Sequence, residues 1–311
     1  GSGSDSEGVH NGKEKDQMVK AALLWILLSV TAAVGYYIKP QTIIAYIAIA
    51  VYFAFDAGMG ALRRRILFLG TGLLSLVLML FLTKAALIPS IGIETDDERS
   101  FGMAHYFMMG LNDETDGVYS DEDTLYTDAF ETPEEKRRAD MELAGDRIKA
   151  YGPAGLIEHL KNKTLVNYND GLFAWGIDGN FFGGRDYEDL GSVPDMSFTE
   201  WIWSFIRPDG ADHGKYSSAQ QTIWITVLLL GLIFACFALR DLFIKNTPSG
   251  GTTASCGSGM AYIVMLALAG LFVFELLFEA KARYLFIYIP YYLILSVYGT
   301  AYLSGGAKWE R

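Results

Sequence analysis

Three charged residues near the end of an apolar segment are the first candidates for chemistry in this chain. Glu275, Glu279 and Arg283 are spaced four residues apart, so they share one face if a helix continues through them. Charges this close to hydrocarbon usually pair with one another or serve a functional site. The planar guanidinium of Arg283 suits a phosphate or a pyrophosphate. An interfacial salt bridge that caps a tight turn accounts for these charges equally well.

Lys39 and His105 are further candidates, and each lies close to an expected membrane span. Pro40 follows Lys39 and fixes the turn, so the lysine is held in a defined place. A lysine at a membrane edge can also simply extend its ammonium group into water. His105 lies in the apolar stretch Met103–Asn112, where a histidine among aromatic residues is more often packed than catalytic.

The acidic stretch Asn112–Asp123 loosely resembles a calcium-binding loop. Oxygen-bearing side chains fall at positions 1, 3, 5, 9 and 12 of the stretch, and Gly117 falls at position 6. Asn at position 1, Glu at position 3 and Asp at position 12 depart from the calcium pattern, so a solvated acidic loop is the simpler interpretation. The sequence predicts no metal ligands and no cofactor, with a divalent cation left as an alternative.

The elements that must position these residues are membrane spans. The chain is 51% hydrophobic, and its apolar residues cluster in blocks, whereas a soluble domain would distribute them with a strand or helix period. A bilayer core of about 30 Å needs roughly 20 apolar residues as a helix, whose backbone groups are paired internally. Six stretches qualify as transmembrane helices: Met18–Ile38, Thr42–Leu62, Ile66–Leu87, Gln221–Leu239, Met260–Phe278 and Tyr284–Leu303.

Lysine and arginine residues near the ends of these spans predict the orientation, because they favour the cytoplasmic side. They gather at four places that share one face if six helices cross: Lys13, Lys15, Lys20, Arg63, Arg64, Arg65, Arg240, Lys245, Lys308 and Arg311. We therefore expect a multi-pass protein of the cell membrane with both termini in the cytoplasm. The expected divisions are 1–17 (a disordered cytoplasmic segment or linker), 18–88 (helices 1–3), 89–218 (extracytoplasmic domain), 219–303 (helices 4–6) and 304–311 (cytoplasmic tail).

The extracytoplasmic domain, residues 89–218, is expected to be acidic and of α+β type. It holds 27 acidic and 11 basic side chains, which argues against a nucleic-acid partner, because phosphate binding needs a basic surface. Thr132 is the expected N-cap of its first helix. The predicted segments are helices at Pro133–Ala150 and Pro153–Lys163, turns and short strands at Asn167–Arg185, and a segment along the membrane surface at Phe198–Ile206.

Several short motifs, taken together, resemble the C-terminal half of bacterial GT-C membrane glycosyltransferases. In chain order they are Tyr-Ile-Lys-Pro at 37–40, His-Tyr-Phe-Met-Met-Gly-Leu-Asn at 105–112, Asp-Gly-Val-Tyr at 116–119, Tyr-Gly-Pro at 151–153, Asn-Asp-Gly-Leu-Phe at 169–173 and Glu-Ala-Lys-Ala-Arg-Tyr-Leu-Phe at 279–286. The chain is most similar to the protein O-mannosyltransferase-like and aminoarabinose-transferase-like enzymes. The resemblance touches most of residues 36–303.

The resemblance implies transfer of a sugar from a polyprenyl-phosphate donor to an acceptor on the outer membrane face. By position, Lys39 and Arg283 would bind the lipid phosphate. Glu279 would orient Arg283 or the sugar, and Tyr284 would belong to the same substrate-binding group. His105 would face the active-site cavity as the catalytic residue. The expected partners are a polyprenyl-phosphate-linked sugar and membrane lipid.

The first outer loop departs from the resemblance. GT-C enzymes generally carry a catalytic Asp or Glu in a long first outer loop, whereas residues 36–42 hold no carboxylate. Family members also usually have more spans. We therefore expect the chain to be the C-terminal part of a longer enzyme, with the base in a missing N-terminal half.

Two other classes of function remain open. A transporter would need polar groups or broken helices at the bilayer midplane. Only Pro290 breaks a predicted span, and Asp56 lies near the cytoplasmic end of the second one. A non-catalytic, membrane-anchored scaffold is compatible with the acidic domain, but it gives no reason for Lys39, Glu279 and Arg283 to occur at one expected depth.

Overall fold

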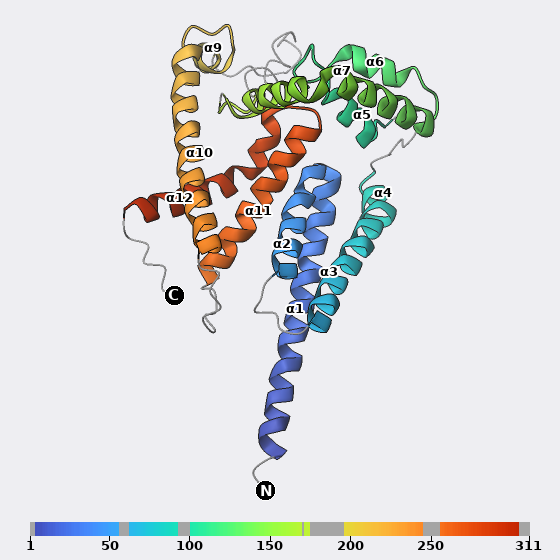
Figure 1. Cartoon of the computed structure of the whole chain (residues 1–311), viewed down its shortest axis with the longest axis vertical. Helices are drawn as coiled ribbons and strands as arrows, with labels where there is room; N and C mark the ends of the chain where they lie inside the picture. Colours follow the sequence, from blue (N-terminus) through green and yellow to red (C-terminus); the bar gives the residue numbers. More distant parts are fainter. Residues whose placement is uncertain are drawn as a thin grey trace. The chain divides into compact units, whose positions relative to one another are not determined.

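The computed structural model describes residues 4–55, 62–92, 100–169, 171–174, 196–244 and 256–304. The chain divides into two compact units (Figure 1). The first unit comprises residues 1–95 and 250–270 together with Arg311, and the second comprises residues 96–249 and 271–310. Helix α11 (Cys256–Leu277) contributes to both units.

Within the described residues, five helices are long and apolar enough to cross a membrane. They are Val19–Ile38, Arg65–Ser90, His213–Arg240, Gly259–Leu277 and Ala282–Leu303. Each corresponds to one of the six predicted spans. The prediction of a polytopic helical membrane protein is therefore confirmed, and five of its spans are found.

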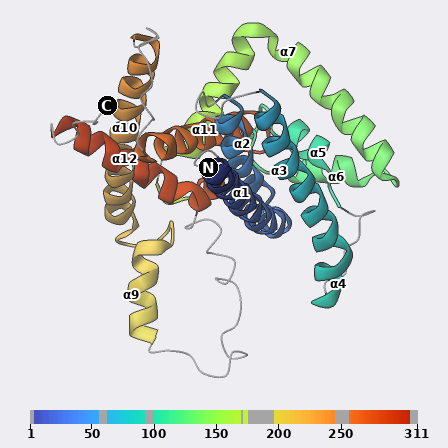
Figure 2. The ribbon, with the colours of Figure 1, turned by 90° about the horizontal axis from the view of Figure 1, so that it is seen from below.

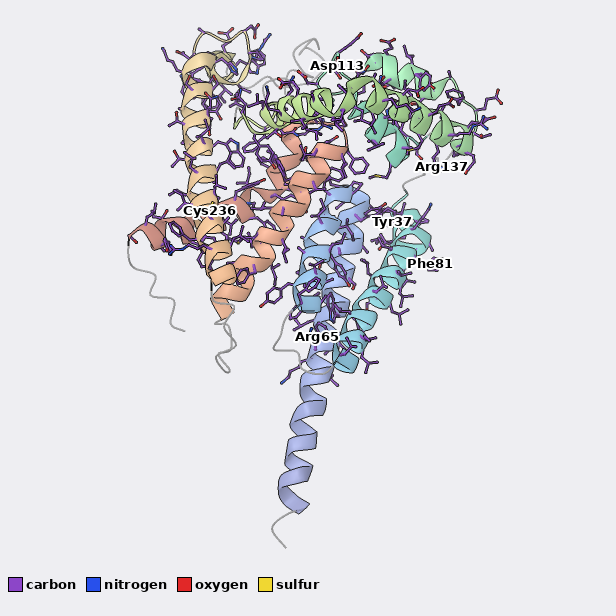
Figure 3. The ribbon with its side chains drawn as sticks, in the orientation of Figure 1. Tyr37, Arg65, Phe81, Asp113, Arg137 and Cys236 are labelled. Atoms are coloured by element: carbon purple, nitrogen blue, oxygen red, sulfur yellow. The ribbon has the colours of Figure 1, made fainter. Side chains whose placement is uncertain are left out.

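Helices α1 (Ser4–Ile38) and α3 (Leu62–Leu82) of the first unit pack side by side and run in the same direction. At one end the Trp25 ring lies 5.2 Å from the Phe68 ring. Towards the other end the Tyr37 hydroxyl donates to the carbonyl oxygen of Leu80 at 3.3 Å. Figure 3 shows Tyr37 and Arg65 at opposite ends of this bundle. Because α1 and α3 run in the same direction, the chain between them must run in the opposite direction over the same distance.

The returning helix is α2 (Ile43–Phe55), which follows a 3-10 turn at Pro40–Thr42. It has only 13 residues, so the predicted full-length span at Thr42–Leu62 is not among the five. The described helix begins one residue after the predicted start, so the difference in length lies at its other end. Residues 56–61 lie outside the described part of the chain. Arg65 Nη1 donates to the carbonyl oxygen of Ala54 at 3.3 Å, so the end of α2 lies beside the start of α3.

Helices α10 (His213–Ile244) and α12 (Ile289–Leu303) of the second unit also pack together and run in the same sense. The rings of Trp224 and Tyr292 are 5.0 Å apart at one end of the contact, and those of Phe237 and Tyr302 are 4.3 Å apart at the other. Gly299 permits this close approach, since a Cβ there would lie 2.1 Å from the carbonyl oxygen of Leu230. The start of the last predicted span is a 3-10 helix, η6 (Ala282–Tyr288). Pro290 lies in the first turn of α12, where its missing N–H costs no hydrogen bond, so it does not break the span.

Three helices form the described core of the acidic region: α5 (Met103–Met109), α6 (Asp121–Asp128) and α7 (Pro133–Tyr168). Thr132 caps α7 as predicted, because its hydroxyl accepts from the backbone N–H of Glu135 at 3.2 Å while the Glu135 carboxylate accepts from the backbone N–H of Thr132. Gly152 has φ 58° and ψ 179° and interrupts α7 before Pro153, and Figure 2 shows the resulting bend. The two predicted helices on either side of this break are therefore confirmed.

The predicted strands at Asn167–Arg185 are not supported. Asn167 and Tyr168 are the last residues of α7, and the Tyr168 hydroxyl lies 3.0 Å from that of Tyr292 on α12. The structure describes no strand in any of its residues, and 175–185 lie outside them. The described acidic region is thus helical rather than α+β.

The segment predicted to lie on the membrane surface forms a helix, α9 (Met196–Ile206). Phe198 and Trp201 are exposed on it, and their rings stack with centroids 5.9 Å apart. The place of this helix at the membrane surface stays a prediction.

Candidate functional site

The candidate site begins where helix α11 ends. The helix stops at Leu277, and Lys281 has extended backbone (φ −157°) before η6 begins. The backbone N–H of Ala280 donates to the carbonyl oxygen of Gly117 at 2.7 Å, which ties this turn to the acidic region. The expectation of one helical face through Glu275, Glu279 and Arg283 is therefore wrong, because the helix does not continue through the three residues.

Glu279 is nonetheless brought into a hydrogen-bonded group with Arg283 and Tyr284. The Glu279 carboxylate is 5% exposed, and its Oε2 accepts from the Tyr284 hydroxyl at 2.6 Å. Arg283 hydrogen-bonds to the Tyr284 side chain, and its guanidinium carbon lies 5.6 Å from the Tyr284 ring centroid. Arg283 itself is exposed. A cation at the surface is thus connected through a tyrosine to a buried carboxylate.

His105 and Tyr106, on α5, lie within electrostatic reach of this group. Burial raises the pKa of Tyr106, and the Glu279 carboxylate raises it further while Arg283 lowers it. Burial lowers the pKa of His105, against the opposing effect of three carboxylates, those of Asp140, Asp123 and Glu279 in that order. His105 is 2% exposed, and its ring stacks on Phe101 with centroids 4.4 Å apart.

Four of the five predicted site residues therefore belong to one compact unit: His105, Glu279, Arg283 and Tyr284. Lys39 belongs to the other unit. Its backbone is held as expected, with its N–H bonded to the carbonyl oxygen of Gly35 at 2.7 Å and its own carbonyl oxygen accepting from the Thr42 hydroxyl at 3.0 Å. The site described here is accordingly built without Lys39.

Lys163, on α7, is a central residue that the sequence reasoning missed. Its side chain is fully buried, and Nζ donates to the carbonyl oxygens of Gly110, Leu276 and Phe278 at 2.7, 2.9 and 2.7 Å. Burial lowers the pKa of Lys163 to about 8, and the carboxylates of Glu275 and Glu279 oppose that shift. Lys163 thus holds the end of α11 against the turn after α5.

The signal that could have identified Lys163 is its spacing along α7. His159, Lys163 and Asn167 are spaced four residues apart, and all three are buried. The sequence predicted only that Lys163 ends a helix. The four-residue spacing, which places these three residues on one face of a helix, was the available evidence that Lys163 is buried.

Thr127 and Asp140 are two more buried polar residues beside His105. His105 Nδ1 lies 2.7 Å from the Thr127 hydroxyl oxygen, which in turn lies 2.7 Å from Asp140 Oδ1. Burial raises the pKa of Asp140, and the hydrogen bond from Thr127 and the proximity of His105 oppose that shift. Both residues lie in charged or polar stretches of the sequence, where nothing distinguished them from surface positions.

The loosely calcium-like stretch at Asn112–Asp123 has a different internal structure. Arg147 binds Asp123 with two hydrogen bonds of 2.6 and 3.0 Å, and Asn112 Nδ2 donates to Asp123 Oδ2 at 2.9 Å. The first and twelfth residues of the stretch therefore bind each other, where a calcium loop would turn both towards the ion. Within the described residues, no three His, Cys, Asp or Glu side chains gather to hold a metal ion.

Residues 9–302 match the model of a family described as "conserved hypothetical integral membrane protein". The chain belongs to this family. Comparison with curated proteins and with solved structures gave no match. The match to this integral membrane protein family includes every candidate site residue, and with the five apolar helices it agrees with a multi-pass membrane protein.

Proposed function

We propose that this protein is the C-terminal part of a membrane glycosyltransferase that transfers a sugar from a polyprenyl-phosphate donor on the outer membrane face. The observation that carries the proposal is the group formed by Arg283, Tyr284 and Glu279 at the end of α11, with His105 within electrostatic reach. Ionisable residues at the edge of a membrane span mark functional sites by default. The sequence resemblance implies that this group binds a lipid phosphate and a sugar.

Arg283 is proposed to bind the lipid phosphate. Its guanidinium is exposed and beside the Tyr284 ring, so a phosphate can approach it while Tyr284 and Glu279 hold its orientation. When the bond between the sugar and the phosphate breaks, negative charge accumulates on the phosphate oxygens. A fixed cation there stabilises the transition state more than the ground state, which is the requirement for catalysis.

The proposed topology has six spans, with α2 as a short second crossing. Helices α1 and α3 run in the same direction, so the chain must return between them. The 13 residues of α2 cover about 20 Å at about 1.5 Å per residue. That is close to the roughly 18 Å that separates the levels of Trp25 and Tyr37 along α1 by the same rise. Six crossings put both termini on one side of the membrane and residues 89–218 on the other. The lysine and arginine pattern makes the side of the termini the cytoplasm in this proposal.

The test of the proposed function is sugar transfer in lipid nanodiscs by the longer enzyme that contains this chain. A panel of polyprenyl-phosphate sugars is supplied, and released polyprenyl phosphate is measured. Arg283→Ala is expected to lower kcat/KM by about 10²–10³-fold, the usual effect of removing one group that stabilises transition-state charge. Arg137→Ala is the matched control, because Arg137 is exposed on α7 and pairs only with Glu134 one turn away among the contacts described. Equal activity of the Arg283→Ala variant and the wild type would exclude the proposed role.

Lys39 was assigned to the same phosphate by the sequence resemblance, and Lys39→Ala tests that assignment separately in the same assay. The transporter alternative would depend on Asp56, which lies outside the described residues. Ion or solute flux into proteoliposomes that is lost in Asp56→Asn would favour transport over transfer.

A further inference from the structure

His105, Thr127 and Asp140 form a short hydrogen-bonded series in which each member is buried. The exposed fractions are 2% for His105, 0% for Thr127 and 1% for Asp140. The two contacts, His105 Nδ1 to Thr127 Oγ1 and Thr127 Oγ1 to Asp140 Oδ1, are both 2.7 Å long. Buried polar groups are normally satisfied, and a series this short fixes the direction of each hydrogen bond.

The threonine hydroxyl has one hydrogen and therefore decides the tautomer of His105. Its hydrogen can go to Asp140 Oδ1 at 2.7 Å or to the carbonyl oxygen of Asp123 at 3.2 Å, and both of these groups accept. The shorter bond to a carboxylate is the stronger one. With its hydrogen committed, Thr127 can only accept from His105, so His105 Nδ1 must carry the proton. Nε2 then has a lone pair.

Nε2 is the nitrogen that remains for chemistry. In the part of the chain that the structure describes, the only hydrogen bond of the His105 side chain is the one made by Nδ1. The ring stacks on Phe101 and meets the Tyr106 ring edge to face. The titratable groups that act on it are Asp140, Asp123 and Glu279, and Lys136 acts on Asp140 in turn. Lowering of its pKa by burial keeps the ring neutral near pH 7, so that it can accept a proton.

We propose that Thr127 and Asp140 are positioning residues that hold the proton of His105 on Nδ1 and make Nε2 the proton acceptor of the site. This inference rests on the proposed function. It places a general base within the chain, in place of the carboxylate expected in a missing N-terminal half. A nucleophile activated by a base that a third group orients is a general arrangement in enzymes.

The proposed step balances as a displacement at the sugar carbon. The acceptor hydroxyl gives its proton to His105 Nε2, and the hydroxyl oxygen forms the new bond to the sugar. The bond between the sugar carbon and the phosphate oxygen breaks, and its electron pair leaves with polyprenyl phosphate. The imidazolium is stabilised by the Asp140 carboxylate through Thr127, and it returns its proton to water after the product leaves.

The first experiment measures the tautomer directly. The chain has four histidines, so the full chain in nanodiscs labelled with ¹⁵N-histidine gives few signals, and His105→Gln assigns the relevant one. We expect His105 of the wild type to carry its proton on Nδ1. Thr127→Val keeps the shape of the side chain but removes the hydroxyl, and it is expected to move the proton to Nε2. Thr127→Ser retains both hydrogen bonds and should keep the wild-type tautomer. A wild-type proton on Nε2 overturns the inference.

The second experiment measures transfer by the same variants. Thr127→Val and Asp140→Asn are expected to lower kcat by about 10²-fold, the lower end for loss of a general base. KM should change by no more than about twofold, because neither residue touches substrate. Thr127→Ser should rescue kcat to within about threefold of the wild type, which excludes a mere folding defect.

The outcomes separate this inference from the proposed function. If Arg283→Ala abolishes transfer while Thr127→Val and Asp140→Asn leave kcat unchanged, the inference fails and the proposed function stands, with the base supplied elsewhere. If no variant or wild-type chain transfers sugar while the tautomer is as expected, the base role fails together with the proposed function, and only the hydrogen-bonded series remains.

Discussion

The helix pair α1 and α3 and the helix pair α10 and α12 share one construction. In each pair two spans run in the same direction, with a returning segment between them in the chain. In each a glycine lies at the contact: a Cβ on Gly72 would lie 3.0 Å from the Trp25 ring, and a Cβ on Gly299 would lie 2.1 Å from the carbonyl oxygen of Leu230. In both pairs a glycine lets the two helix backbones approach closely, as expected where spans associate through close packing of small residues.

The two pairs differ in the buried polar groups of their units. In the first unit those described are neutral: Ser29, Gln41 and Thr83. The Tyr46 hydroxyl joins its helices by donating to the carbonyl oxygen of Gly72 at 2.7 Å. In the second unit the described buried groups include His105, Asp123, Lys136, Asp140, His159, Lys163, Glu275 and Glu279. The described buried polar groups of the first unit are thus neutral, whereas those of the second include ionisable side chains, whose burial costs free energy. The site is assigned to the second unit for this reason.

The largest expected effect comes from removing the buried lysine of the second unit. Lys163→Met keeps the length of the side chain but leaves three carbonyl oxygens and the nearby Glu275 carboxylate without the ammonium group. We expect the free energy of unfolding to fall by about 3–5 kcal/mol, as for breaking other buried charged contacts. Denaturant unfolding in micelles measures it.

Lys161→Met is the matched control two residues away. Lys161 is exposed and pairs with Glu158 on the same helix, so its loss should have no measurable effect. Equal unfolding midpoints for the two variants would show that Lys163 does not stabilise the end of α11.

A smaller effect is expected from methyl groups added at the helix contacts. Gly299→Ala forces a Cβ against the carbonyl oxygen of Leu230, at 2.1 Å without relaxation. We expect a loss of about 1–3 kcal/mol, typical of overpacking. Gly70→Ala on α3 is the control from the other pair, because a Cβ there has no atom within 4 Å. If both variants are equally stable, the close approach of α10 and α12 is incorrect.

The smallest effect is a pH dependence that comes from His105. Its pKa in the folded protein is below 6.5 because of burial, so between the two pKa values the unfolded state binds more protons. The stability contribution is therefore present above about pH 6.5 and is lost as the pH falls below it, by at most about 1.4 kcal/mol per pH unit. His105→Gln should flatten the decline in unfolding free energy between pH 6.5 and 5 relative to the wild type. An unchanged slope contradicts the burial of His105.

What the sequence could predict was local. Thr132 with Glu135 three residues later predicted a helix start, and Gly152-Pro153 predicted a break, because caps and helix breakers act within one turn. The apolar blocks predicted five of the spans, because the hydropathy of a segment is also a local property. The sixth, Thr42–Leu62, corresponds to the 13 residues of α2, and residues 56–61 near its far end lie outside the described part of the chain.

What the sequence could not predict depends on contacts between distant segments. The four-residue spacing of Glu275, Glu279 and Arg283 suggested one helical face, but α11 ends at Leu277, where Lys163 binds its last carbonyl oxygens. Lys163 is separated from that turn by more than a hundred residues of chain. Glu279 and Tyr284 are neighbours in the sequence and bind each other, whereas Thr127 and Asp140 come beside His105 only through the packing of α6 and α7.

The most direct test of the assignment to the second unit is the affinity of the chain for polyprenyl phosphate in nanodiscs. Native mass spectrometry of the wild type, Arg283→Ala and Arg137→Ala gives the three dissociation constants under one condition. The account predicts binding at least about tenfold weaker for Arg283→Ala, the loss of one charge-assisted contact to phosphate, and unchanged binding for Arg137→Ala. Equal affinities in all three would contradict a lipid-phosphate site at the end of α11.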